Sequence, residues 1–212
     1  MRHLFRACDE VAFDFGEAHR CFDVIRAETF VAAYREAYAK DPTSLGPNVR
    51  ANYELGAALS LADCAWAHLE QARIFRRFQT VFEQYDLVLS PTTPISPFPW
   101  TELYLKEING KPLENYYRWL ALTYVVTLVT NPALSLPCGT DQRGMPFGLQ
   151  VIGRFRGDRD VLGAGAALEA AFAGIAALQR PRPDLDRLRK PVPALTSIVT
   201  HPPTGATTRR AV

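Results

Sequence analysis

The residues of this chain that could attack or activate a carbonyl group are few and lie far apart. Such chemistry requires a nucleophile, a base within hydrogen-bonding reach and donors for the oxyanion. The serines are Ser44, Ser60, Ser90, Ser96, Ser135 and Ser197. None of them lies in a Gly-x-Ser-x-Gly turn or forms a Ser-x-x-Lys pair. The lysines lie in polar, turn-rich segments, where they stay charged and make poor bases: Lys40, Lys106, Lys111 and Lys190. We therefore predict no catalytic residue in this chain.

Histidine and cysteine offer one further arrangement, with Cys64 and His68 one helical turn apart. A thiol–imidazole dyad also needs an orienting third group and oxyanion donors, and neither is evident, so we favour structural roles for both residues. Cys138 stands in Pro-Cys-Gly after an expected strand and is predicted to be the more exposed thiol, again without a nearby base. We expect it to fill a small space in the packing.

No pattern in the sequence indicates a metal or a cofactor. The cysteines form no Cys-x-x-Cys pair, and no HExxH motif or carboxylate cluster is present. Phosphate-binding loops are also absent, and Gly163-Ala164-Gly165 falls within an expected helix, where it favours close packing. We predict no metal and no cofactor, and free thiols typical of a reducing, cytoplasmic location.

The composition is that of a globular domain with no evident macromolecular ligand. The chain has 212 residues, of which 48% are hydrophobic and 22% charged, and its formal net charge is +2. The arginine-rich stretches at 154–159 and 180–189 are interleaved with aspartates, which favours a solvated surface over an anion site. No window approaches the roughly 20 apolar residues of a membrane helix, and no signal peptide is recognisable. We expect neither nucleic acid nor membrane as a partner.

Two helices are predicted in the first part of the chain. Residues 20–39 place apolar side chains on one face, and the prolines and glycine of 41–48 end that helix. A second helix is predicted over 52–84, because apolar residues repeat there at intervals of four and three. At about 1.5 Å per residue it would span about 50 Å. A helix of that length suits the flank of a sheet larger than this chain can build alone.

The second part of the chain is predicted to alternate strands, loops and short helices. The Asn109-Gly110 pair indicates a small hairpin, and Asp158 is the expected N-cap of a helix. The predicted strands cover 86–90, 133–137 and 147–152, and the predicted helices cover 113–128 and 159–173. Residues 91–100, rich in proline, are expected to form an extended loop.

Three motifs in this part resemble the C-terminal portion of the amidase signature family. They are Ser-Pro-Thr-Thr-Pro at 90–94, Asn-Pro-Ala-Leu-Ser-Leu-Pro-Cys-Gly at 131–139 and Gly-Met-Pro-Phe-Gly-Leu-Gln at 144–150. Gly153 and Asp158 follow at the places where that family has them. The similarity extends over about residues 20–195. Several short motifs in the right order are more specific than any one of them.

The resemblance implies an α/β fold. This would be the C-terminal part of a mixed β-sheet core flanked by helices, incomplete on its own. The amidase portion would cover 1–195, with 196–212 as an extended, disordered tail. Members of the family hydrolyse carboxamides with a serine nucleophile, a bridging serine and a lysine base. All three come from the N-terminal half, a region that resembles nothing in this chain, so no catalytic residue is carried over.

The resemblance also implies that the loop at 91–100 and the helix at 113–124 help to wall the acyl pocket. Trp119 and Thr123 are the substrate-binding candidates on that basis. The alternative, that both side chains belong to the core, stays equally open at this point.

We accordingly expect an amidase C-terminal fragment that is inactive alone and meets an amide substrate only when an N-terminal half complements it. It would be a truncated fragment, one subunit of a split amidase, or a non-catalytic module that binds a small ligand or a partner. Without their remaining neighbours the predicted strands would leave sheet edges and an apolar face open, which favours pairing with another chain or self-association.

Overall fold

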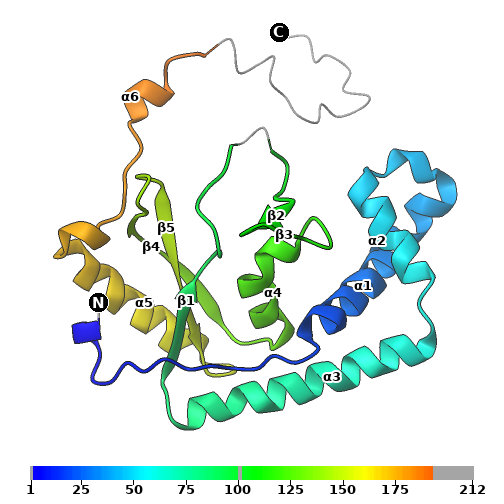
Figure 1. The fold of residues 1–212 in the computed structure, drawn as a ribbon, viewed down its shortest axis with the longest axis horizontal. Coiled ribbons are helices and arrows are strands. Elements are labelled where there is room, and N and C mark those ends of the chain that lie inside the picture. Colours follow the sequence, from blue (N-terminus) through cyan, green and yellow to red (C-terminus); the bar gives the residue numbers. More distant parts are fainter. Residues whose placement is uncertain (1, 100–101, 193–212) are drawn as a thin grey trace.

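The computed structural model describes residues 2–99 and 102–192, and the tail expected at 196–212 lies outside them. A three-stranded antiparallel sheet stands between helices, as Figure 1 shows. Helix α5 packs on one face of the sheet, and α1, α3 and α4 form a layer on the other side. The helices are α1 (Ala18–Lys40), α2 (Pro47–Ala57), α3 (Leu61–Gln79), α4 (Ala121–Leu128), α5 (Asp158–Ala173) and α6 (Leu185–Leu188). The strands are β1 (Leu87–Pro91), β2 (Glu107–Ile108), β3 (Lys111–Pro112), β4 (Ala133–Thr140) and β5 (Pro146–Gly153).

The three strands predicted for the sheet are confirmed, and their order is β1-β5-β4. Leu89 lies opposite Val151, and Leu134 lies opposite the same residue on the other side of β5. Side chains alternate between the two faces of a strand, so this register places the large apolar residues in two sets. Strand β5 is therefore shielded on both edges, whereas β1 and β4 form the edges of the sheet.

Each face of the sheet carries its own hydrophobic cluster. The cluster under α5 contains Leu136, Leu149, Val151, Leu168 and Phe172. The cluster on the other face joins α1, α3 and α4 and includes Cys21, Ile74, Phe78, Val129 and Ile152. The apolar face that was expected to be open is thus covered by helices among the described residues.

The single helix predicted over 52–84 is wrong, because the chain breaks between α2 and α3. Ser60 is the reason for the break. Its hydroxyl accepts a hydrogen bond from Asp63 N (3.2 Å), while the Asp63 carboxylate accepts one from Ser60 N (3.0 Å). This capping box starts a new helix and is visible in the sequence as Ser60-x-x-Asp63. The repeat of apolar residues continues across the break, which is why periodicity alone missed it.

The helix predicted over 113–128 is shorter than expected. Only Ala121–Leu128 is α-helical, preceded by a 3-10 turn at Arg118–Leu120. The Asn115 side chain accepts a hydrogen bond from Tyr117 N (3.2 Å), and such a local bond competes with helix formation. The β-branched residues Val125 and Val126 remain helical because both are buried in the core.

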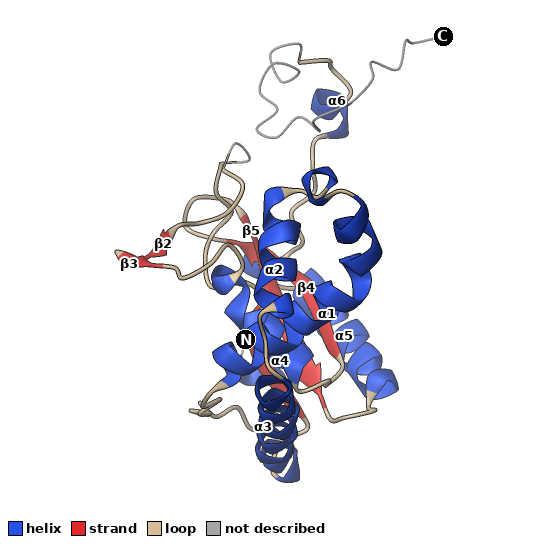
Figure 2. Ribbon diagram, turned by 90° about the vertical axis from the view of Figure 1, so that its right-hand side faces the viewer, coloured by secondary structure: helices blue, strands red, loops and turns tan. Residues whose placement is uncertain are grey.

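Two turn predictions have different outcomes. The Asn-Gly hairpin is confirmed: Asn109 and Gly110 have φ of 53° and 72° and join β2 to β3. This hairpin projects away from the three-stranded sheet (Figure 2). Asp158 is not the N-cap of α5 but its first residue, and Gly157 occupies the cap without a side-chain hydrogen bond. Asp158 still lies in the first turn, where a carboxylate is favourable to the helix dipole.

Candidate functional site

A row of polar side chains crosses the sheet on the face opposite α5. Gln150 at its centre is buried and donates from Nε2 to Ser90 Oγ (2.9 Å) and to the carbonyl oxygen of Leu122 (3.0 Å). The hydroxyls of Thr92, just after β1, and Ser135, in β4, lie 2.8 Å apart. We call Ser90, Thr92, Ser135 and Gln150 the polar row. The bond to Leu122 ties the row to the start of α4.

Gly148 keeps space open in this row. It lies opposite Pro137 on β4, and Thr92 N donates to its carbonyl oxygen (2.9 Å). A Cβ at this position would lie 2.8 Å from Thr92 Oγ1 and 3.2 Å from Ser135 Oγ. Only glycine therefore lets the two hydroxyls meet across the end of the sheet.

An open cavity of about 490 Å³ adjoins this end of the sheet. One wall is the loop after β1 and the other is the β4–β5 turn. The lining residues are Pro91, Thr93, Pro94, Ile95, Ser96, Thr140, Asp141, Gln142, Arg143, Pro146, Phe147 and Gly148. Five residues of the loop at 91–100, which was expected to wall a pocket, line this cavity.

Trp119 and Thr123 do not line that cavity. Both side chains are partly buried, and each donates its hydrogen bond to a nearby backbone carbonyl. Trp119 Nε1 donates to Tyr116 O (3.1 Å) and Thr123 Oγ1 donates to Leu120 O (2.8 Å). The Trp119 ring packs edge-on against Phe98 with centroids 5.5 Å apart. The indole face and the Thr123 methyl group are therefore what these residues offer to a neighbour, and their role in a pocket stays a prediction.

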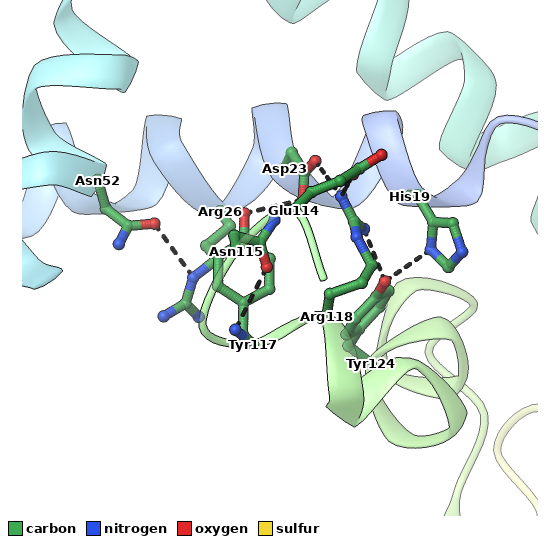
Figure 3. Close-up of polar contacts among 9 residues, drawn as sticks. All are labelled: His19, Asp23, Arg26, Asn52, Glu114, Asn115, Tyr117, Arg118 and Tyr124. Atoms are coloured by element: carbon green, nitrogen blue, oxygen red, sulfur yellow. Dashed lines mark hydrogen bonds and ion pairs between the residues drawn. The ribbon is translucent and has the colours of Figure 1, made fainter. Parts of the chain in front are cut away.

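A buried ion-pair network fixes the segment that carries Trp119 (Figure 3). The Arg118 guanidinium, only 9% exposed, lies 2.7 Å from Asp23 Oδ2, 2.7 Å from Glu114 Oε2 and 2.7 Å from Tyr124 Oη. Tyr117 Oη donates to the other oxygen of Asp23 (2.8 Å). Burial alone would lower the pKa of Arg118, but hydrogen bonds to Tyr124 and Asp23 raise it overall, so the arginine stays charged.

A second set of bonds extends this network to α2. Arg26 donates to Tyr116 Oη (2.7 Å) and to Asn52 Oδ1 (3.3 Å), and buried Asn52 donates to the same phenol (3.0 Å). Arg26 also lies over the Tyr117 ring, 4.6 Å from its centroid. Residues 114–124 are thus held on α1 and α2 by charged hydrogen bonds rather than by a strand pairing. The sequence showed these residues only as scattered charges and aromatics, and it did not predict the network.

His19 is the titratable end of the network. Its Nδ1 lies 2.6 Å from Tyr124 Oη, which also accepts from Arg118. Arginine can only donate, so the Tyr124 hydroxyl keeps its own proton and can donate it to His19 Nδ1 when His19 is neutral with its proton on Nε2. A protonated Nδ1 would instead donate to the second lone pair of the same oxygen. Burial, and then the charge of Arg118, lower the pKa of His19 from its ordinary value of 6.5.

We expect the chain to lose stability as the pH falls below about 6.5. The unfolded chain then binds a proton at His19 that the folded chain resists, so the stability present above this pH is lost as protonation proceeds. Urea unfolding between pH 7.5 and 5.0 measures the effect. His19→Asn should flatten this part of the profile, because an amide oxygen can replace Nδ1 as acceptor. His68→Asn is the control, since exposed His68 pairs only with Glu28 (2.9 Å), and an equal change in both variants would contradict the assignment.

The described residues hold no assembled nucleophile and base. No serine hydroxyl among them hydrogen-bonds a lysine or a histidine, and the four lysines are all exposed. Cys64 is not bonded to His68, which is exposed and pairs with Glu28 instead. Cys138 is buried rather than exposed, so that prediction is wrong; its side chain packs under α5, and burial raises the pKa of its thiol. The expectation that it fills a small space is confirmed.

Two further properties concern the described residues. They contain no group of three or more histidines, cysteines or carboxylates that could hold a metal ion. No helix in residues 2–99 and 102–192 is both long enough and apolar enough to cross a bilayer.

The chain resembles known proteins over most of its length. It is 36% identical over 144 residues to the A subunit of glutamyl-tRNA(Gln) amidotransferase from Rhizorhabdus wittichii, which is 65% of this chain and 28% of that protein. A crystal structure of amidase superposes with a TM-score of 0.69 at 25% identity, over 76% of this chain and 37% of that one. A vestigial protein complex, described for the origins of an s-triazine catabolic enzyme, has a chain with a TM-score of 0.73 at 20% identity, over 85% of this chain and 39% of that one.

The match to a family model covers the elements that build the site. The chain spans about a third of the length of the relatives and structures that it matches. The mixed α/β architecture is the one seen in part of the amidase structures. The family model described as Amidase matches residues 10–162, which include the polar row, the ion-pair network and the loop after β1. The chain therefore belongs to the amidase family.

Proposed function

We propose that this chain is the C-terminal part of an amidase and supplies pocket walls and a sheet segment, but neither nucleophile nor base. Amide hydrolysis would then require the remaining part of the domain. The observation that carries this proposal is the family match at 10–162, combined with the absence of any serine–lysine or serine–histidine hydrogen bond among the described residues. Oxyanion stabilisation and nucleophilic attack need such a set, and a pocket wall does not.

The wall would consist of the loop after β1, the polar row and the segment at 118–124. Residues Trp119 and Thr123 are its candidate contacts with the acyl part of an amide substrate. The network around Arg118 supports this assignment, because it holds the segment rigidly on α1 without using the faces of Trp119. Rigid support of a binding wall is what a pocket requires for specificity.

A partner chain is a natural source of the remaining part. The R. wittichii relative is named as one subunit of an enzyme, and one structural neighbour is described as a vestigial complex. We infer that this chain works in an assembly of similar kind, with a carboxamide as the substrate. Its location is proposed to be cytoplasmic, in keeping with its free cysteines.

The test is amide hydrolysis by the purified chain with and without the polypeptide encoded immediately upstream. We expect release of ammonia or amine only from the mixture, with no rate above background from either polypeptide alone. In the active mixture, Trp119→Ala should raise KM more than it lowers kcat, because it removes a substrate contact rather than a reacting group. Tyr53→Ala is the matched control, since this aromatic residue stacks on Tyr38 at α1 and α2, away from the row.

Hydrolysis by this chain alone would overturn the proposal. In that case Ser90 and Ser135, the hydroxyls of the polar row, would be the first residues to replace. A mixture that stays silent would also count against it and would favour a binding module without chemistry.

A further inference from the structure

We propose that the free edge of β1 is a docking site for an extended strand from the remaining part of the amidase domain. This inference rests on the proposed function and names the surface through which the two parts join. It is carried by the hydrogen-bonding groups of β1, by the contrast with the other sheet edge and by the groove that lies beside β1.

The backbone groups that face this edge follow from the strand register. Thr92 N donates to Gly148 O (2.9 Å), and Ser90 and Val88 lie opposite Gln150 and Ile152. Hydrogen-bonded pairs alternate along an antiparallel ladder, so Leu87 and Leu89 direct their N–H and C=O groups away from β5. Within the described residues these groups form no hydrogen bond to another backbone group. They constitute an unused template for one more strand.

The opposite edge of the sheet, at β4, is blunted. Pro137 within β4 has no backbone N–H to donate, and a second proline, Pro132, directly precedes the strand. The turn at Ala176–Leu178 packs against this strand, so closely at Gly139 that a Cβ there would lie 2.2 Å from Ala177 O. Prolines and a covering segment are common means of protecting an edge from pairing. Each edge lacks one outward N–H, at Pro137 and at Pro91, but β4 is also covered by the packed turn, so β1 is the more open of the two edges.

A groove of about 520 Å³ runs beside β1. Residues 5–11 form one side and residues 84–89 the other, and Figure 1 shows the N-terminal segment passing β1 on its way to α1. Phe5, Leu87 and Leu89 in this groove also pack against the cluster under α5. A strand added here would therefore place every second side chain over an existing apolar core. The docking strand should therefore have apolar residues at every second position, as in binding by β-augmentation.

The occupant is the rest of the amidase domain rather than a second copy of this chain. The chain covers 28% of the R. wittichii relative, so most of the fold of that protein has no counterpart here. A two-fold copy would pair β1 with itself about Leu89 and set Pro91 against Leu87. Pro91 cannot donate, so two of the six possible backbone bonds would be missing. A strand without a proline opposite Leu87 lacks only one of the six, the bond that Pro91 of this chain cannot donate to any partner.

Cys8 reports on the occupancy of the groove. It is partly exposed and lines the groove, whereas Cys64 is partly exposed on α3 and serves as an internal control. N-ethylmaleimide labelling is followed by mass spectrometry, with and without the upstream polypeptide. We expect labelling of Cys8 to slow at least about tenfold in the mixture, while labelling of Cys64 is unchanged. Slowing of Cys8 with rising concentration of this chain alone would show self-pairing and overturn the assignment.

Two proline variants test the backbone contact itself. Leu89→Pro removes an outward N–H from β1, and Ala133→Pro does the same at the blunted edge. We expect Leu89→Pro to weaken the complex by about tenfold or more and Ala133→Pro to leave it unchanged, as measured by co-purification and titration. The melting curve of each free variant checks its folding. If Leu89→Pro does not fold, the Cys8 measurement on the natural chain decides.

The outcomes separate this inference from the proposed function. If the mixture hydrolyses the amide while Cys8 is labelled as fast as in the free chain, the β1 docking site is wrong and the proposed split amidase stands. Protection of Cys8 without hydrolysis would support docking and count against the proposed function. No complex at all would overturn the docking site.

Discussion

Replacing Arg118 by methionine should lower the free energy of unfolding by about 3 kcal/mol or more. The variant keeps the volume of the side chain but leaves the Asp23 carboxylate, 25% exposed, without its cation. It also removes the donor that bonds to Tyr124 Oη at 2.7 Å. The loss of a partner from a buried ion pair is larger than the net value of the pair, because the remaining charge stays desolvated.

Arg189→Met is the matched control for Arg118→Met. Arg189 forms an ion pair with Asp186 at 3.1 Å, but the two side chains are 76% and 88% exposed. Exposed pairs contribute little, so we expect a change within about 0.5 kcal/mol. Urea unfolding of both variants measures the difference. Equal destabilisation would mean that the buried network does not hold residues 114–124 on α1. Arg118→Lys should recover only part of the loss, since one ammonium cannot bridge Asp23, Glu114 and Tyr124.

The second large effect is expected at Gly56, where α2 crosses α1. A Cβ at this position would lie 2.3 Å from the carbonyl oxygen of Ala27 and 2.7 Å from its carbon. Both atoms belong to the backbone of α1, so the helices would have to separate. Alanine normally stabilises a helix interior by up to about 1 kcal/mol over glycine. Here we expect Gly56→Ala to destabilise the fold by about 2 kcal/mol or more, because overpacking outweighs propensity.

Gly163→Ala provides the control with the opposite sign. Gly163 lies exposed in α5, and no atom stands within 4 Å of the position that a Cβ would take there. The substitution should stabilise the chain by about 0.5–1 kcal/mol through helix propensity. Denaturant unfolding of the two alanine variants tests the contrast. Stabilisation by both would show that α1 and α2 are free to move apart.

Gly163 and Gly165 show what sequence spacing predicts about helix packing and what only the folded structure decides. The sequence predicted close packing for both residues. Gly165 does pack closely, with a Cβ position 2.2 Å from Leu134 Cδ2, whereas Gly163 faces open space. Helical spacing shows that two glycines lie on a helix, but only the packed neighbours decide which one is needed.

Five residues of the loop at 91–100, which was expected to line a pocket, line the cavity beside the polar row. A pocket role for Trp119 and Thr123 stays a prediction. The prediction that the chain holds no nucleophile and no base was made from residue types and motifs, which can be read without a fold. The network of Arg118, Asp23, Tyr124 and His19 was not predicted, since its members are separated by up to 105 positions in the sequence. Nothing local marks such a network.

The family, the three strands of the sheet and the Asn-Gly hairpin follow from the sequence alone. Each of these depends on short-range features, namely motif order, alternation of apolar residues and turn chemistry. The packed fold was needed to establish the order β1-β5-β4, which edge stays open and which charges are buried together. Those properties depend on contacts between distant segments, and their energies come from desolvation and packing that no local pattern of residues encodes.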